Sequence, residues 1–442
     1  MRLLAFRSRA ADLLPLVPAA ALPLIFLHVK YQAHASVGPV NVYGSDVAIL
    51  AVVVAAATAG MLFGWQRVLE PKLLWLTAAA LLAMFVVSCF WSPLESTTSH
   101  LVTAAKSAEY ALLAPAAVLL FRRSVDLFRF LAVFVAWAAA ASGWGLLQFL
   151  GIVNEFDGKR PGQREVSFLG HEDFGAFAAA ALAVGLVSLA FGERPRFAQT
   201  AIVAGGLGVV LDASISAYGG IVLAAIAVVW VGRRAGTLSI RKILAIGGML
   251  VVLGAGVNVL RGSDVTNYLS FLGIHPAKTK ESGVQTGSQR VVLLYIGVRI
   301  WEDHPWLGVG FQRSENRYQP YLAAAERRYP NEPRATFPSQ THEWGIQNFW
   351  LQLLADTGVV GFLLGVATFA AGLGRAYRSL AQHRFGALVA GCWILVAAGT
   401  WNAIGIVAGI PLDAITWLGI GLAAAAQWMD MAPADREKEA AG

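Results

Sequence analysis

The chain has 442 residues, of which 57% are hydrophobic and 14% are charged, and its formal net charge at pH 7 is +7. Soluble proteins carry about 25% charged residues and disordered chains are poor in apolar ones, so the composition excludes both classes. The only two cysteines, Cys89 and Cys392, exclude a disulfide-rich scaffold. A membrane-spanning helix uses roughly 20 mostly apolar residues, so the composition predicts an all-α polytopic membrane protein with about a dozen transmembrane helices.

Continuous apolar runs, each about 17–24 residues long, define the predicted transmembrane helices. Their continuity excludes a membrane β-barrel, whose strands are short segments of alternating hydrophobicity. The seventh and eighth helices are short, and a tight stretch from Ser216 to Gly220 is expected to join them. In chain order, the predicted helices cover 12–29, 47–65, 73–91, 105–121, 130–150, 174–191, 199–215, 217–231, 243–260, 346–370, 386–408 and 412–429.

This pattern predicts four parts of the chain. The first nine transmembrane helices lie in 1–260, a large outer loop occupies 261–345, the last three transmembrane helices lie in 346–429, and 430–442 is a cytoplasmic tail. No cleavable signal peptide is expected, because the first apolar run lacks a small-residue cleavage site and further spans follow it.

The distribution of basic residues predicts the orientation in the membrane, because Lys and Arg stay in short cytoplasmic loops. With both termini in the cytoplasm, the outer loop 92–104 contains no Lys or Arg. The net positive charge then reflects topology, and no nucleic-acid partner is expected. The segments predicted to be cytoplasmic contain Arg2, Arg7, Arg9, Arg67, Lys72, Arg122, Arg123, Arg129, Arg194, Arg196, Arg233, Arg234, Arg241, Lys242, Arg375, Arg378 and Arg384.

The outer loop 261–345 is rich in charged and aromatic residues, and we expect it to form an ordered cap on the outer membrane face. Residues 289–301 predict an amphipathic helix that is too short to span but suited to the membrane interface. His304-Pro305 ends this helix, and a tight turn with two glycines follows at 307–311. A second helix is predicted at 319–328.

Several segments resemble the O-antigen ligase and O-antigen polymerase superfamily. The run from Gln347 to Gly361 is similar to its signature, in which a His-Asn pair is followed about ten residues later by Gly and then by another small residue. Residues 289–301 resemble its arginine helix, and 304–310 its Pro-Leu-Gly-Val-Gly turn. Residues 164–174 are similar to its outer loop before a middle span.

Two positions depart from the family pattern. Gln347 occupies the place of the family histidine, and glutamine cannot take up a proton. The nearest histidine is His342, five residues earlier. The other family arginine would fall near Ala217-Tyr218-Gly219, where no basic residue is present.

The resemblance implies an inverting, metal-independent glycosyltransferase with a C-type membrane fold and no cofactor. Such an enzyme transfers a glycan from a polyprenyl-diphosphate carrier to a glycolipid, a glycan or another hydroxyl acceptor. Its active site would lie at the outer face of the bacterial cytoplasmic membrane, in contact with membrane lipids. Arg290, with Arg164 or Arg160, would hold the diphosphate, because a guanidinium group binds phosphate oxygens in pairs. His342, or failing it Glu172 or Asp173, would accept the proton of the acceptor hydroxyl.

Further candidates and simpler explanations stay open. Gln347 and Asn348 would begin a helix whose amides favour anions, although polar capping alone also explains them. Arg313 either touches glycan or phosphate or is surface charge. Arg290 could instead be a helix-end arginine that reaches lipid head groups, and His342 a solvated loop histidine. No metal site is expected, because the histidines of the outer loop are far apart and lack ligand-spaced partners.

Three rival functions remain at this point. A polymerase would join lipid-linked repeat units, and a transporter would move lipid-linked glycans through a path lined by ionisable residues within the spans. A third possibility is a family member that has lost its chemistry together with the histidine and serves as a binding or assembly subunit.

Overall fold

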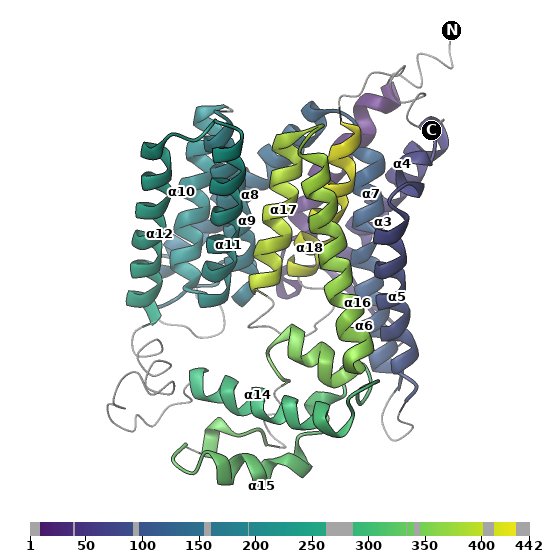
Figure 1. Cartoon of the computed structure of the whole chain (residues 1–442), viewed down its shortest axis with the longest axis vertical. Coiled ribbons are helices and arrows are strands. Elements are labelled where there is room, and N and C mark those ends of the chain that lie inside the picture. Colours follow the sequence, from purple (N-terminus) through teal and green to yellow (C-terminus); the bar gives the residue numbers. More distant parts are fainter. Residues whose placement is uncertain are drawn as a thin grey trace.

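The computed structural model describes residues 9–38, 40–91, 97–153, 161–192, 194–261, 286–332, 334–339, 345–400 and 411–429. Antiparallel helices form a bundle, and two further helices lie across one end of it (Figure 1). We call this end the cap face and the other end the opposite face.

The helices and strands occur in the following order. The α-helices are α2 (Val17–Ile25), α3 (Gly44–Phe63), α4 (Gln66–Leu69), α5 (Lys72–Ser88), α6 (Thr97–Ala111), α7 (Leu113–Leu120), α8 (Ser124–Phe149), α9 (His171–Phe191), α10 (Pro195–Asp212), α11 (Ile215–Arg234), α12 (Ile240–Arg261), α14 (Thr286–Asp303), α15 (Gln319–Arg328), α16 (Phe349–Ser379), α17 (Arg384–Thr400) and α18 (Pro411–Ala425). Short 3₁₀ helices are η1 (Leu14–Leu16), η2 (Val29–Tyr31), η3 (Ser314–Asn316), η4 (Arg334–Thr336) and η6 (Ala426–Trp428), and the two strands are β1 (His34–Val37) and β2 (Val40–Tyr43).

Each of the twelve predicted spans contains a helix, so the prediction of an all-α polytopic membrane protein is confirmed. Within the described residues, six helices are long and apolar enough to cross a membrane by length and composition: α3, α8, α9, α11, α12 and α16. The helices on the first and last predicted spans, α2 and α18, are shorter than the apolar runs from which they were predicted.

Small residues allow the central helices to pack closely. A Cβ on Gly205 of α10 would lie 2.5 Å from the backbone nitrogen of Leu182 in α9, and one on Gly399 of α17 would lie 2.5 Å from the Cα of Gly220 in α11. Glycine and alanine therefore bring these backbones together, as they do in many membrane helix bundles. Helix α9, which is rich in alanine, is consequently the most deeply buried of the six helices that are long and apolar enough to cross a membrane.

Two details differ from the predicted elements. The predicted span 105–121 is divided into α6 and α7, because Pro115 has no N–H to continue the hydrogen-bond pattern of α6. The turn between α10 and α11 lies at Ala213-Ser214, not at 216–220, which belong to α11. Ala213 has φ +50°, and the Ser214 hydroxyl accepts a hydrogen bond from the amide of Ala217, so the eighth helix starts earlier than its apolar run.

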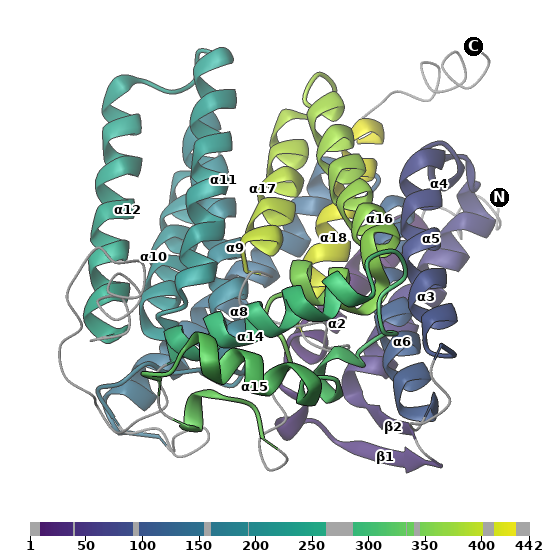
Figure 2. The same cartoon turned by 60° about the horizontal axis from the view of Figure 1, so that its bottom comes forward.

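The cap face carries the elements between the spans that were predicted to be outer. Helix α14 crosses this face, α15 lies beneath it, and the β1–β2 hairpin lies on the same side (Figure 2). Both loop helices coincide with the helices predicted at 289–301 and 319–328. The antiparallel hairpin, which pairs His34 with Tyr43, was not predicted, since its strands are too short to show an alternating pattern.

Candidate functional site at the cap face

Helix α16 is interrupted at Gly358, and a turn from the preceding loop lies against the interruption. Gly358 has φ +64° and ψ −168° within an otherwise helical run. The amides of Val309 and Gly310 donate hydrogen bonds to the carbonyls of Ala355 and Asp356, and the amides of Val359 and Val360 donate to the carbonyls of Pro305 and Trp306, with lengths of 3.0, 2.8, 2.9 and 3.3 Å. The backbone groups that the break leaves without helical partners are thus satisfied by the turn.

Only glycine fits the two points of closest approach. A Cβ on Gly308 would lie 2.3 Å from the carbonyl carbon of Asp356, and one on Gly358 would lie 2.2 Å from that of Trp306. Both glycines also have positive φ, a region that other residues adopt only with strain. The predicted glycine turn is therefore confirmed. The turn and the helix signature, which are separate motifs in the sequence, form one structural unit.

A buried carboxylate extends this unit. Asp356 is fully buried, and its two oxygens accept hydrogen bonds of 2.9 Å from the backbone amides of Gln312 and Ser314. Arg313 lies between these residues, is also fully buried, and donates a 2.9 Å hydrogen bond to the carbonyl of Cys89 after α5. Arg313 thus ties the loop to the bundle, while its predicted contact with glycan or phosphate remains a prediction.

Helix α14 packs its apolar side against the start of α16. Val292, Ile296 and Ile300, spaced four residues apart, are buried in one cluster, as expected for an amphipathic helix. A Cβ on Gly297 would lie 2.9 Å from the side chain of Ile346, just before α16. Arg290 is partly buried in the first part of α14, two residues before this apolar stripe.

A second group of charged residues gathers at the turn between α10 and α11. Arg164 donates through Nε to the carbonyl of Asp212 at 2.8 Å, and its Nη2 lies 3.6 Å from a carboxylate oxygen of the same residue. Arg261, at the end of α12, donates through Nε to the carbonyl of Ala213 at 2.7 Å. Two guanidinium groups from distant parts of the sequence therefore meet at one turn on the cap face.

Sequence reasoning identified Arg164 but missed two members of this group. Arg261 is only 9% exposed and Asp212 is fully buried. In the sequence, Arg261 is one of several arginines that close an apolar run, so nothing distinguished it. The signal that could have identified Arg261 is the absence of a basic residue at 217–219, where the family has an arginine. An arginine at the end of another helix on the same face could take the place of that residue.

Two acidic residues lie close to this group in the chain. Glu165 is fully buried, and Asp173 in the first turn of α9 is 8% exposed. The backbone of Glu172 belongs to the same first turn, but its side chain lies outside the described residues.

The signature residues before α16 have local structural roles. Asn348 is the N-cap of the helix, and its Oδ1 accepts a 2.9 Å hydrogen bond from the amide of Leu351. Gln347 has φ +49°, so the chain turns sharply as it enters the helix. The capping interpretation of Asn348 is confirmed, whereas an anion-binding role for either residue is untested.

Other predicted residues lie outside the part of the chain that the structure describes. These are His342, the predicted base, and Arg160, the alternative phosphate ligand. Among the described residues, no group of three or more His, Cys, Asp or Glu side chains could hold a metal ion.

The fold and the cap define a polytopic membrane protein whose large loop is anchored in a broken transmembrane helix. Residues 200–366 match the family model described as O-antigen ligase, which supports the resemblance of this chain to the O-antigen ligase superfamily. No curated protein matches the chain. The matched region contains Arg261, Arg290 and the unit formed by the turn and the break in α16, but it begins after Arg164. It supports a membrane enzyme of the ligase or polymerase type in general.

Proposed function

We propose that this protein transfers a glycan from a polyprenyl-diphosphate carrier to a hydroxyl acceptor at the cap face. The acceptor is a glycolipid or a glycan, and the reaction inverts the anomeric centre without a metal ion. The leaving diphosphate needs cationic hydrogen-bond donors, for which arginine is well suited. The observation that carries the proposal is that Arg290 sits partly buried on a helix packed across the cap face, within the region that matches the family.

Arg164 and Arg261 complete the cationic set of this proposal. Both donate hydrogen bonds to carbonyls of the turn between α10 and α11. In both views, the first part of α14 lies at the same end of the cap face as α10 and α11 (Figures 1 and 2). Each Nε donates to a backbone carbonyl, and a guanidinium group carries further N–H groups of the kind that bind phosphate oxygens. In this proposal Arg290 is the main ligand of the diphosphate, and Arg164 and Arg261 are additional ligands.

The cap face is proposed to be the outer face of the bacterial cytoplasmic membrane. What supports this orientation is the basic content of the opposite face, since short cytoplasmic loops are rich in Lys and Arg. Elements that end at the opposite face carry Arg67, Arg122, Arg123, Arg194, Arg234, Arg375, Arg378 and Arg384.

The proposed base is His342, which lies three residues before Gly345 in the sequence. It is preferred to Glu172 because an imidazole near neutral pH can both accept the hydroxyl proton and release it again. Gln347, in the position of the family histidine, cannot take this role.

The role of Arg290 is tested with purified protein, a lipid-linked oligosaccharide and an acceptor. Loss of one charge-assisted contact to the diphosphate is expected to lower kcat/KM of Arg290→Ala by about 10- to 100-fold. Arg299→Ala is the matched control, because Arg299 lies on the same helix but is paired with Glu302 at 2.6 Å and is 49% exposed. Equal activity of the two variants would contradict the assignment of Arg290.

The role of His342 is tested in the same assay with His342→Ala, using His304→Ala, an exposed histidine directly after α14, as the control. General base catalysis contributes roughly 10²- to 10⁴-fold, so kcat should fall by that order in the first variant only. If His342→Ala keeps its activity and Glu172→Gln loses it, the base is Glu172.

Product length decides between the two reactions of the family: one added chain indicates a ligase, and a ladder of products indicates a polymerase.

A further inference from the structure

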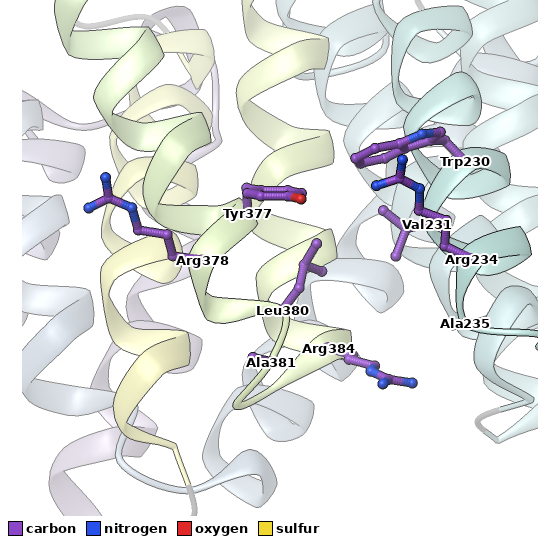
Figure 3. Close-up of a pocket in the computed structure, with 9 residues that line it drawn as sticks. All are labelled: Trp230, Val231, Arg234, Ala235, Tyr377, Arg378, Leu380, Ala381 and Arg384. Carbon is purple, nitrogen blue, oxygen red and sulfur yellow. The ribbon is translucent and has the colours of Figure 1, made fainter.

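A cavity opens on the opposite face, between the end of α11 and the hairpin that joins α16 to α17. Its volume is about 420 Å³. It is far from the cap, since α11 and α16 both start at the cap face and end here (Figure 1). The side chains that define its chemistry are Trp230, Arg234, Tyr377, Arg378, Leu380 and Arg384 (Figure 3).

Two of its arginines are available for a ligand. Arg234 and Arg384 make no ion pair with any residue that the structure describes, and both lie on the side of the cavity between the two helices (Figure 3). Arg378 points away from Trp230 in the same view. By contrast, Arg375, one turn earlier on α16, is already paired with Glu70 at 3.0 Å. The cavity is therefore cationic, and its charge is not neutralised from within the described chain.

Aromatic side chains form the walls. The rings of Trp230 and Tyr377 are stacked with centroids 6.0 Å apart, and the guanidinium of Arg234 lies 4.4 Å from the centroid of the Trp230 ring. Both rings remain about half exposed, at 43% and 57%. Tryptophan and tyrosine with one apolar side and one polar side are typical of the membrane interface.

An apolar track leads from the cavity along α11. Leu223, Ile226 and Trp230 are spaced three and four residues apart, so they share one face of the helix. All three are exposed, at 43%, 60% and 43%. An acyl chain that lies along this face would enter the cavity at Trp230, directly beside Arg234.

We propose that this cavity binds the head group of an anionic phospholipid of the leaflet at the opposite face. Arg234 and Arg384 bind the phosphate, Trp230 and Tyr377 contact the glycerol region, and the acyl chains follow Ile226 and Leu223. Guanidinium groups match phosphate oxygens, and juxtamembrane arginines attract anionic lipids. A free anion would bind the arginines but would gain nothing from contact with the aromatic walls and the apolar track. A phospholipid would contact all three, so these features favour the lipid. Bound lipid would join α11 to the α16–α17 hairpin on the side away from the cap.

The test uses full-length protein in mixed micelles that contain equal amounts of phosphatidylglycerol and phosphatidylcholine with the same acyl chains. Lipid that remains bound is counted by native mass spectrometry. Wild-type protein should retain phosphatidylglycerol, and Arg234→Gln/Arg384→Gln should bind it about 25-fold more weakly, since each arginine near a membrane surface contributes a factor of about five. Arg233→Gln/Arg241→Gln loses the same charge from exposed residues outside the cavity and should retain the lipid.

Further controls distinguish binding of a lipid from a general effect of charge and from binding of a free anion. Arg234→Lys/Arg384→Lys keeps the charge and should retain more lipid than the glutamine variant, which also guards against an effect of misfolding. Three results would overturn the proposal: equal retention in both glutamine double variants, equal retention of phosphatidylcholine, or complete displacement of phosphatidylglycerol by inorganic phosphate.

Discussion

The backbone amide of Ser314 donates a 2.9 Å hydrogen bond to the carboxylate of Asp356, which lies 42 residues further along the chain. The contact joins the large loop to a transmembrane helix at the point where that helix is broken. Together with the amide of Gln312 on the other carboxylate oxygen, it fixes the path of the chain after the glycine turn. The position of α14 across the cap face follows, because the same turn begins directly after α14 ends.

Removing the Asp356 carboxylate should loosen the cap. Asp356→Ala leaves two buried amides without their acceptor. Hydrogen bonds to charged groups contribute about 1.5–3 kcal/mol each, so a loss of about 3–6 kcal/mol is expected. Asp356→Asn keeps one carbonyl oxygen as an acceptor and should lose less. Thermal unfolding and trypsin cleavage at Arg327 in α15 measure the effect. Glu302→Gln, at a half-exposed position on α14, is the control, and cleavage as slow in Asp356→Ala as in this control would refute the anchor.

A side chain at the break in α16 should separate it from the glycine turn. Gly358→Ala places a methyl group 2.2 Å from the backbone of Trp306 and forces a positive φ on alanine. Overpacking and backbone strain of this kind cost about 1–3 kcal/mol each. Gly374→Ala on the same helix meets nothing within 4 Å and should be neutral or stabilising, because alanine is the better helix former. Equal melting temperatures for the two variants would contradict the close approach.

Arg164 and Arg261 should act together on the turn between α10 and α11. Each binds one carbonyl of the adjacent residues Asp212 and Ala213, so their contributions should be non-additive. A double-mutant cycle with Arg164→Gln and Arg261→Gln is expected to give a coupling of about 0.5–3 kcal/mol. Glycan-transfer rates and unfolding free energies of the four proteins measure it. Strict additivity in both readouts would show that the two side chains work independently.

Tyr321 should titrate unusually late. Burial, and then the 2.6 Å hydrogen bond that its hydroxyl donates to Asp303, raise its pKa from 10 to about 12. Between these values the folded protein keeps a proton that the unfolded chain loses, so the stabilisation from the neutral phenol is complete below pH 10 and disappears as the pH rises towards 12. The phenolate absorbance of wild type minus that of Tyr321→Phe reports the titration. Asp303→Asn should move the midpoint of the Tyr321 titration back towards pH 10. An unchanged midpoint would show that Asp303 does not raise the pKa of Tyr321.

Much of the architecture follows from local sequence patterns. Apolar runs of membrane-spanning length located a helix in every predicted span, and the amphipathic repeat around Val292 and Ile296 predicted α14. His304-Pro305 predicted the end of this helix after Asp303. These features depend on neighbours within a few residues, which is why composition and periodicity reveal them. The β1–β2 hairpin was missed because four-residue strands carry too little pattern.

The amino-acid sequence alone determined the membrane class, the helices and the resemblance to the superfamily, since apolar length and short motifs are properties of contiguous residues. Tertiary structure alone decided that the glycine turn fills the break at Gly358, that Asp356 holds the loop, and that Arg261 joins Arg164 at one turn. These arrangements bring together residues from different helices. They depend on which buried backbone groups need a partner once the bundle has packed, and that requirement appears only in the folded chain.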